Sequence, residues 1–260
     1  MLGHEKRWLM EHARQRFPTS SRRQNEFLKH LIWARTRRKV PLQYLLGSQP
    51  FGHADIKCRA PVLIPRFDTE AWVMRLAEQW RGQRGAIVDL CTGTGCIAIE
   101  LALSLPGIHC LGVDISKKAV RLARENAIRN KVADRVQFAP YDVLNDTAPL
   151  FDRFFRAHHG ARHLVANPPY ILATEMSTLP RDVALFEDDR ALIGTERHRN
   201  VDGWRYYHVI LGLGERLKAD SVTMEIGTQS LTEAPVSSLY HRALWRDDQQ
   251  HPRVLHYTLR

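Results

Sequence analysis

The stretch AIVDLCTGTGCIAIELALS, residues 86–104, decides the fold class. It begins with an apolar run of strand length (86–90), continues into a short loop that contains Gly93 and Gly95, and ends in an apolar run of helix length (96–104). A glycine loop between a strand and a helix is typical of α/β folds, because it lets backbone N–H groups approach a ligand. The stretch therefore predicts a sheet with a ligand site at the carboxyl end of its first strand.

Apolar strands alternate with amphipathic helices on the carboxyl side of this stretch. We expect further strands and helices at 109–114, 117–130, 135–140, 163–167, 201–218 and 221–226. The apolar segments 238–245 and 253–259 flank RDDQQHP and predict an antiparallel hairpin. Five parallel strands closed by such a hairpin indicate a methyltransferase-type α/β sheet, mostly parallel and seven-stranded, rather than a six-stranded dinucleotide-binding fold.

The amino-terminal side has a different organisation. Helical spacing of apolar residues predicts two helices between residues 4 and 37, separated by PTSS at 18–21. QPFGHADIKC at 49–58 predicts a short β-hairpin, and the proline-bounded PVLIPR at 61–66 predicts an extended bridge. We therefore divide the chain into a basic helical segment (1–48), a hairpin linker (49–66) and a catalytic domain (67–260).

Charge divides the chain near the same place. Residues 1–66 carry 14 Lys or Arg and 4 Asp or Glu, while residues 67–260 carry 24 of each, so the formal net charge of +10 belongs to the first part. Such a segment could meet nucleic acid, a ribonucleoprotein or an acidic protein face, or be only a solvated basic surface. It could also hold a remnant of a mitochondrial targeting sequence, although Glu5 and Glu11 interrupt the acid-poor pattern of a presequence.

Composition narrows the class of protein. The chain has 260 residues, 44% of them hydrophobic, which is enough to fill a large α/β core. No apolar run approaches the roughly 20 residues that cross a bilayer, so we expect a soluble protein without a membrane partner. Four cysteines without a C-x-x-C pair favour buried thiols in a reducing compartment. We interpret His158, His159 and His163 as a solvated loop and assign no metal, because nothing nearby completes a ligand set.

An acidic residue completes the expected ligand pocket. Asp114 ends the second strand about 20 residues beyond the glycine turn, where a carboxylate can accept both hydroxyls of an adenosine ribose. The glycines do not continue as G-x-G-x-x-G, which argues against NAD. Asp89 beside the loop suits a ligand with a positive centre, such as S-adenosylmethionine. Asp142, after the third strand, is either a neighbour of the adenine or a helix N-cap.

The fourth strand is followed by NPPY, residues 167–170. The two prolines stiffen the backbone and leave the carbonyl of Pro168 without an obvious ladder partner. Because strands two and four of such a sheet face one crevice, Asn167 and Asp114 should lie across the same ligand. The Asn167 side-chain oxygen and the Pro168 carbonyl could then aim an amide or amine nitrogen at a methyl donor. The alternative is a rigid turn in which Tyr170 is only a core residue.

In this order and spacing, PVLIPRFDTE, DLCTGTGCIAIELA, VDIS, NPPYI and LFEDDRALIG resemble the HemK/PrmC family, the glutamine-N5 methyltransferases of peptide-chain release factors. The resemblance covers roughly residues 40–227 and is greatest to the fungal mitochondrial branch. The sequence departs from the family at Cys91, where a loop glycine is usual, at Asp188, where a proline is common, and in a shorter amino-terminal part.

The resemblance implies a class I, Rossmann-like methyltransferase fold that uses S-adenosyl-L-methionine and releases S-adenosyl-L-homocysteine. It implies catalytic roles for Asn167, Pro168, Pro169 and Tyr170, with Tyr170 packing on the substrate side chain. We expect the cofactor to contact Asp89, Thr92, Gly93, Gly95, Asp114, Ile115, Asp142 and Asn167. We expect the substrate to contact Arg66, Asn167, Pro168, Tyr170, Phe186 and Glu187. Arg66 and Glu70 would lie at the pocket mouth or form a plain surface ion pair.

The implied substrate is the glutamine of the Gly-Gly-Gln motif in a class I release factor, modified by a monomer that needs no direct nucleic acid. The implied location is the mitochondrial matrix, or the cytoplasm for a bacterial protein. The alternative is a DNA or RNA amino-methyltransferase acting on adenine N6 or guanine N2, since NPPY is shared in kind and the sequence pI is 9.8. Against it, no target-recognition insertion is present and the region around the fourth strand lacks interleaved basic and aromatic residues. A binding module without chemistry is a third hypothesis, which an intact Asp114 and Asn167 disfavour.

Overall fold

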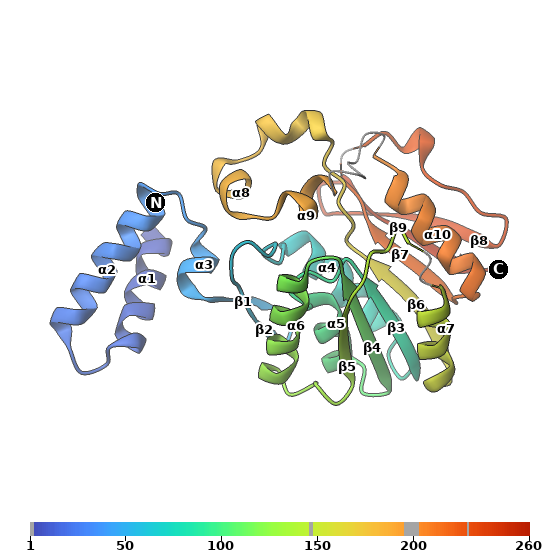
Figure 1. Cartoon of the computed structure of the whole chain (residues 1–260), viewed down its shortest axis with the longest axis horizontal. Coiled ribbons are helices and arrows are strands. Elements are labelled where there is room, and N and C mark those ends of the chain that lie inside the picture. Colours follow the sequence, from blue (N-terminus) through green and yellow to red (C-terminus); the bar gives the residue numbers. More distant parts are fainter. Residues whose placement is uncertain (1–2, 146–147, 195–202, 228) are drawn as a thin grey trace.

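The centre of the molecule is a seven-stranded sheet, in a computed structural model that describes residues 3–145, 148–194, 203–227 and 229–260 (Figure 1). The strand order is β5-β4-β3-β6-β7-β9-β8; the first five strands in this order are parallel, and β9 pairs antiparallel with β7 and β8. The predicted parallel sheet with a carboxyl-terminal hairpin is confirmed. The strands are β3 (Gly85–Leu90), β4 (Ile108–Asp114), β5 (Val136–Pro140), β6 (Ala161–Ala166), β7 (Ser221–Glu225), β8 (Tyr240–Arg246) and β9 (Pro252–Leu259).

The position of β3 creates the crevice in which a ligand can bind. β3 comes first in the sheet along the chain but lies in the middle of it, with β4 on one side and β6 on the other. The strand order reverses direction at this point, and ligands of open α/β sheets bind outside the carboxyl ends of the strands there. The segments that follow β3, β4 and β6 must therefore supply the walls of any site.

Helices cover both faces of the sheet. α4 (Phe67–Gln79), α5 (Cys96–Ser104) and α6 (Lys117–Arg129) share one buried core with Ile87 of β3. α7 (Ala148–Ala157) and α10 (Arg205–Leu217) share the other core with Val88. Successive residues of a strand point to opposite faces, so a strand covered on both sides is mostly apolar, as β3 is except at Asp89. The predicted helix at 201–218 is confirmed as α10 from residue 205; residues 201–202 lie outside the described residues.

The amino-terminal part forms a separate helical unit on one side of the sheet (Figure 1). The two predicted helices are confirmed as α1 (Gly3–Arg16) and α2 (Ser21–Thr36), and Ser20 caps α2. A short α3 (Leu42–Leu46), which the sequence pattern does not single out, closes a small apolar core on them through Leu42. Across all described residues, no helix is both long enough and apolar enough to cross a membrane.

The predicted hairpin is confirmed as β1 (Ser48–Phe51) and β2 (Ala54–Lys57), and it packs against α5 and α6. Phe51 and Ile56 are fully buried in the same core as α5. Glu100 of α5, also fully buried, accepts the backbone N–H groups of His53 (2.7 Å) and Ala54 (3.2 Å). Gly52 lies in the turn between β1 and β2 with φ +56°, and a Cβ added to it would lie 2.5 Å from the Glu100 carboxyl carbon. The hairpin thus contributes side chains to the core of the catalytic domain.

The first part of the connection between β6 and β7, residues 167–194, lies above the carboxyl edge of the sheet (Figure 1). It contains a 3₁₀ turn η1 (Ala173–Thr178) and two short helices, α8 (Arg181–Phe186) and α9 (Asp189–Ile193). The Asp188 N–H donates to the carbonyl of Pro61 (2.8 Å), which ties this segment to the bridge after the hairpin. A second 3₁₀ turn, η3 (Leu231–Glu233), follows β7.

Candidate active site

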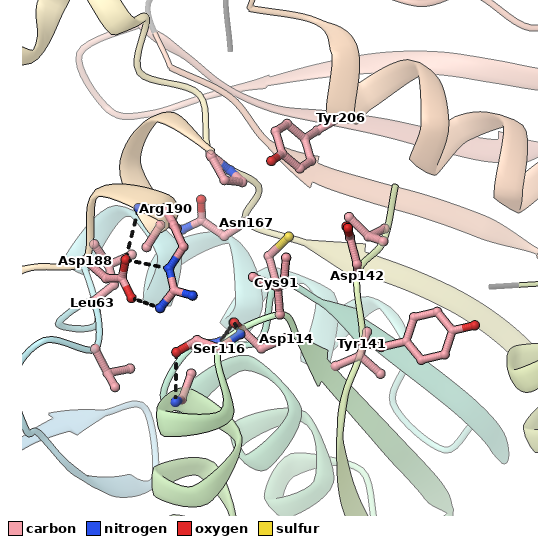
Figure 2. Close-up of a pocket in the computed structure, with 18 residues that line it drawn as sticks. Leu63, Cys91, Asp114, Ser116, Tyr141, Asp142, Asn167, Asp188, Arg190 and Tyr206 are labelled. Carbon is pink, nitrogen blue, oxygen red and sulfur yellow. Dashed lines mark hydrogen bonds and ion pairs between the residues drawn. The ribbon is translucent and has the colours of Figure 1, made fainter. Parts of the chain in front are cut away.

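Two pockets open at the carboxyl edge of the sheet and share Asn167. The first, which we call the glycine-loop pocket, is lined by residues after β3, β4, β5 and β6, among them Gly93, Asp114, Ile115 and Asp142 (Figure 2). The second, the NPPY pocket, is lined by Arg66, Tyr170, Leu179, Val183 and Leu192 beside Asn167.

Asp114 holds the glycine loop through backbone hydrogen bonds. Its Oδ2 accepts the N–H of Gly93 (2.9 Å), and its Oδ1 accepts the N–H of Ser116 (2.8 Å). Burial raises the pKa of Asp114, while these two N–H groups lower it. Each carboxylate oxygen can accept a second hydrogen bond, so Asp114 retains acceptor capacity toward the pocket.

Cys91 occupies the position where a glycine was expected, and it adopts the backbone conformation that favours glycine. Its φ is +60°, in the left-handed region that non-glycine residues adopt at a cost of order 1 kcal/mol. Its sulfur points into the centre of the glycine-loop pocket (Figure 2). The departure at Cys91 therefore preserves the turn and adds a soft apolar atom to the pocket wall.

Asp89 at the end of β3, and Thr92 and Gly95 within the glycine loop, line neither pocket. Asp89 is fully buried; its Oδ2 accepts the Thr92 hydroxyl (2.5 Å), and its Oδ1 has no hydrogen-bond partner. Burial raises the pKa of Asp89 to about 7. Gly95 starts α5 with φ +82°, and a Cβ there would lie 2.8 Å from the Phe138 ring. These residues stabilise the loop on its buried side, and their contact with a ligand stays a prediction.

Asp142 lies in the wall of the glycine-loop pocket, opposite Asp188 and Arg190 (Figure 2). Its Oδ1 accepts the N–H of Leu144 (3.0 Å) in a turn, whereas α7 begins only at Ala148. The helix N-cap alternative for Asp142 is therefore wrong. Contact with an adenine stays a prediction that its position supports.

Asn167 is connected to a buried carboxylate by way of a hydroxyl. Its Nδ2 donates to Thr69 Oγ1 (3.2 Å), and Thr69 Oγ1 donates to Glu225 Oε2 (2.6 Å). The indole N–H of Trp72 donates to the same Glu225 oxygen (2.7 Å), and the Tyr170 hydroxyl lies 3.5 Å from Glu225 Oε1. Thr69 and Trp72 are three residues apart in α4, so they share one helix face.

Thr69 and Glu225 are residues that the sequence reasoning missed. Glu225 is the acidic last residue of β7, as Asp114 is of β4, and this repeated position is the signal that could have identified it. β7 pairs in parallel with β6, and Met224 lies opposite Ala166. The next residues along these strands, Glu225 and Asn167, are therefore neighbours at the sheet edge.

Arg66 forms its ion pair with Glu187 and not with Glu70. Arg66 Nη2 lies 2.5 Å from Glu187 Oε2, and the Glu187 side chain is almost completely buried. The interpretation of Arg66 and Glu70 as a surface ion pair is therefore wrong, because α8 brings Glu187 back onto the bridge. Arg66 lines the NPPY pocket, whereas half-buried Phe186 lines neither of the two pockets.

The departure at Asp188 has a structural consequence of its own. The Asp188 side chain accepts the N–H of Arg190 at the start of α9, and its carboxylate binds the Arg190 guanidinium (2.6 Å). Figure 2 shows this pair on the side of the glycine-loop pocket nearest Asn167. Asp188 thus places a cation, Arg190, in the lining of a pocket that also contains Asp114 and Asp142.

Pro168 and Pro169 are both buried, and Pro169 lines the glycine-loop pocket. Tyr170 lines the NPPY pocket and packs against the core that contains α10. The structure therefore brings Gly93, Asp114, Ile115, Asp142, Asn167 and Pro169 together at one pocket, and Arg66, Asn167 and Tyr170 at the other.

The histidines after α7 do not form a solvated loop throughout. His163 lies in β6, buried against Trp80 with ring centroids 3.9 Å apart, and contacts Ser221 Oγ and Gln83 Oε1. Burial lowers its pKa to about 4. His158 stacks on His109. Among the described residues, no group of three His, Cys, Asp or Glu side chains could hold a metal ion.

Comparison with known proteins places these features in a family. The methyltransferase small domain family matches residues 66–179, which include the glycine loop, Asp114 and NPPY. A release factor glutamine methyltransferase of Thermodesulfovibrio yellowstonii is 35% identical over 217 residues, covering 81% of this chain and 71% of that protein. The mitochondrial MRF1 N(5)-glutamine methyltransferase MTQ1 of Saccharomyces cerevisiae is 36% identical over 176 residues, covering 64% of this chain and 54% of that protein. The chain thus spans about half the length of the yeast relative.

A solved structure shares the fold at low sequence identity. A catalytic domain of METTL16 matches with a TM-score of 0.52 and 15% identity, covering 84% of this chain and 77% of that one. At this identity the match concerns the class I methyltransferase fold alone.

Proposed function

Because this chain belongs to the release factor glutamine methyltransferase family, we propose that it methylates the side-chain nitrogen of a glutamine in a peptide-chain release factor. The chain is a methyltransferase by family and fold. The acceptor group, the cofactor and the protein partner of the reaction are what we propose. The names of the relatives support a glutamine acceptor over adenine or guanine.

The residues of the glycine-loop pocket fit S-adenosylmethionine. Asp114 has acceptor capacity for the ribose hydroxyls, and the apolar side chains of Ile115 and Val143 offer surface to the adenine. The Asp142 carboxylate can accept from the adenine amino group, and Arg190 suits the carboxylate of the amino acid part. When bound, the cofactor would supply an electrophilic methyl group.

The task of the protein side chains is positioning. An amide nitrogen is a weak nucleophile, because its lone pair is delocalised into the carbonyl. The Asn167 oxygen and the Pro168 carbonyl can each accept one N–H of the substrate amide, which holds the nitrogen in one orientation. Holding reactants in attack geometry can contribute several kcal/mol, on the order of 7–11 in the most favourable systems. Buried Pro168 and Pro169 stiffen the backbone that carries these acceptors.

The observation that carries the proposal is that Asn167 lines both pockets. A residue in the shared wall can touch a donor on one side and an acceptor on the other. The NPPY pocket is lined by Arg66, Tyr170 and apolar side chains, and it opens beside the first pocket as a site for a long, neutral amide side chain. We assign the glutamine of the Gly-Gly-Gln motif to it.

We further propose that the basic amino-terminal helices meet the release factor, and that the protein acts as a monomer without nucleic acid. Their exposed Arg37, Arg38 and Lys39 lie outside both pockets. The similarity to the yeast mitochondrial enzyme supports a mitochondrial matrix location, and the bacterial relative supports a bacterial cytoplasm.

A labelling experiment tests the function. The protein is incubated with methyl-labelled S-adenosylmethionine and a purified release factor, or a variant in which the motif glutamine is replaced by alanine. We expect one methyl group on that glutamine by mass spectrometry and none on the variant. Nuclease-resistant label that persists in the variant at another residue, or label in added DNA or RNA, would contradict the proposal.

A further inference from the structure

Two buried hydrogen bonds connect Asn167 to Thr69 and Thr69 to Glu225, and the donor of each can be assigned. Thr69 is almost fully buried, and its hydroxyl is bonded on both sides, to Glu225 Oε2 at 2.6 Å and to Asn167 Nδ2 at 3.2 Å. We propose that Glu225 acts through Thr69 as a positioning residue that turns the Asn167 amide so that its oxygen faces the acceptor. The inference rests on the proposed function, because it specifies how Asn167 meets a substrate amide.

The Thr69 hydroxyl has a single proton and can therefore donate only one hydrogen bond. A carboxylate has only acceptors, so the bond between Thr69 and Glu225 must use that proton. The Thr69 oxygen then has only lone pairs left for its second neighbour. Of the two ends of the Asn167 amide, only the nitrogen can donate to it. The amide oxygen of Asn167 is consequently turned away from Thr69.

The environment of Glu225 holds it as the acceptor. Trp72 donates to the oxygen that Thr69 also contacts, and an indole N–H can only donate. Burial raises the pKa of Glu225, and the hydrogen bonds from Thr69 and Trp72 lower it. Asp68 and Arg253 act on the same group with opposite sign, and the Tyr170 hydroxyl lies at its other oxygen. Glu225 makes no contact with either pocket, so it acts only through its neighbours.

The direction of the contact selects the chemistry of the acceptor. With its oxygen toward the NPPY pocket, Asn167 accepts from a substrate that presents N–H groups, as a primary amide does. With the amide reversed, an N–H of Asn167 would face an N–H of the substrate. A donor opposite a donor leaves both without partners, which costs more than the loss of one hydrogen bond.

Kinetics of two Thr69 variants test the inference. Thr69→Val removes the hydroxyl and keeps the shape, so the Asn167 amide loses its anchor. We expect kcat to fall about tenfold or more, as for loss of a buried hydrogen bond, with the cofactor Kd changed less than about threefold. Thr69→Ser keeps the hydroxyl and should recover most of kcat. Thr223→Val in β7 removes a buried hydroxyl that bonds His256 Nδ1 (2.8 Å) outside both pockets, and it serves as the matched control.

A measurement without turnover keeps this inference separate from the proposed function. The side-chain N–H₂ resonance of Asn167 is assigned by its loss in Asn167→Ala, and its hydrogen exchange is compared in wild type, Thr69→Val and Glu225→Gln. We expect exchange to accelerate at least about tenfold in Thr69→Val, because the donated proton loses its acceptor. In Glu225→Gln the hydroxyl can bond in either direction, so we expect an intermediate rate.

The outcomes of the two measurements separate the hypotheses. Unchanged exchange in Thr69→Val, with a melting temperature that shows the variant is folded, would overturn the role of Glu225 whatever the substrate is. Equal loss of kcat in Thr69→Val and Thr69→Ser would overturn it as well. If the wild-type protein fails to methylate any release factor while exchange accelerates as expected, the proposed function fails and the amide orientation stands.

Discussion

The two walls of the site hold their decisive polar side chains in different ways. Asp114 is held by the backbone N–H groups of Gly93 and Ser116, one of them two residues away and the other in the preceding loop of the same β-α-β unit. Asn167 is held by the side chain of Thr69, which is 98 residues away, and through it by Glu225. The glycine-loop wall is therefore local and made of backbone, whereas the NPPY wall is assembled from side chains of distant elements.

This difference predicts which substitutions disrupt each wall. Backbone donors persist through most substitutions, so Asp114 keeps its partners whenever the loop keeps its shape. By contrast, the contacts that link Asn167, Thr69 and Glu225 are lost when any one of these side chains is replaced. We expect binding to depend on the first wall and turnover on the second, and four experiments test that division.

The largest effect should follow from Asn167→Ala. One of the two acceptors for the substrate amide is lost, so kcat should fall about 100-fold or more while the cofactor Kd changes little. Stopped-flow or quench kinetics with calorimetry measure both quantities. A similar loss in kcat and in cofactor affinity would show that the two walls are not separable.

Asp114→Ala should have the opposite profile. It removes the acceptor for the ligand and leaves the N–H groups of Gly93 and Ser116 without a partner, so the cofactor Kd should rise about 10- to 100-fold. Asp55→Ala, at an exposed carboxylate that pairs with Arg129, is the control for removing an acidic side chain. Calorimetry that finds equal affinities for the two variants would remove Asp114 from the site.

Asp89 should make the glycine-loop wall sensitive to pH. Its folded-state pKa of about 7 lies above the ordinary value of 3.8, so its contribution to stability is present at low pH and is lost as pH rises through about 7. Asp89→Asn should remove a slope of up to about 1.4 kcal/mol per pH unit from the free energy of unfolding between those values. Urea unfolding at several pH values measures it, and parallel profiles for the two proteins would contradict a buried Asp89 that titrates near 7.

The smallest effect concerns the amino-terminal helices. Changing Arg37, Arg38 and Lys39 together to Gln should raise KM for the release factor only a few-fold, because exposed charges are screened, and should leave both walls intact. Arg35 is left unchanged, since it binds Glu5 (2.8 Å) and Asp182 (3.5 Å). A KM that stays the same at low and high salt would argue against electrostatic docking.

The same contrast explains how much the sequence could predict. The strands were predicted to within two residues because their apolar residues occur in short runs or alternate with polar ones, and Asp114 because its position relative to the glycine loop is local. Helix α7 was not singled out. The contacts of Asn167 could not be predicted, because they depend on α4 and β7 meeting at a sheet edge. The partner of Arg66 was predicted wrongly for the same reason: Glu187 reaches it only through the return of α8.

The hydrogen bonds between Glu100 and the hairpin have a consequence for which site on a large protein substrate can be reached. His53, Ala54 and Lys57 bond the hairpin to α5 and α6, so the amino-terminal helices are joined to a segment that is fixed to the main core. The ion pair between Arg35 of α2 and Asp182 of α8 connects the amino-terminal helices to the segment after β6 as well. If the amino-terminal helices meet the release factor as proposed, the distance from these helices to Asn167 limits which glutamine of the bound protein can reach the site.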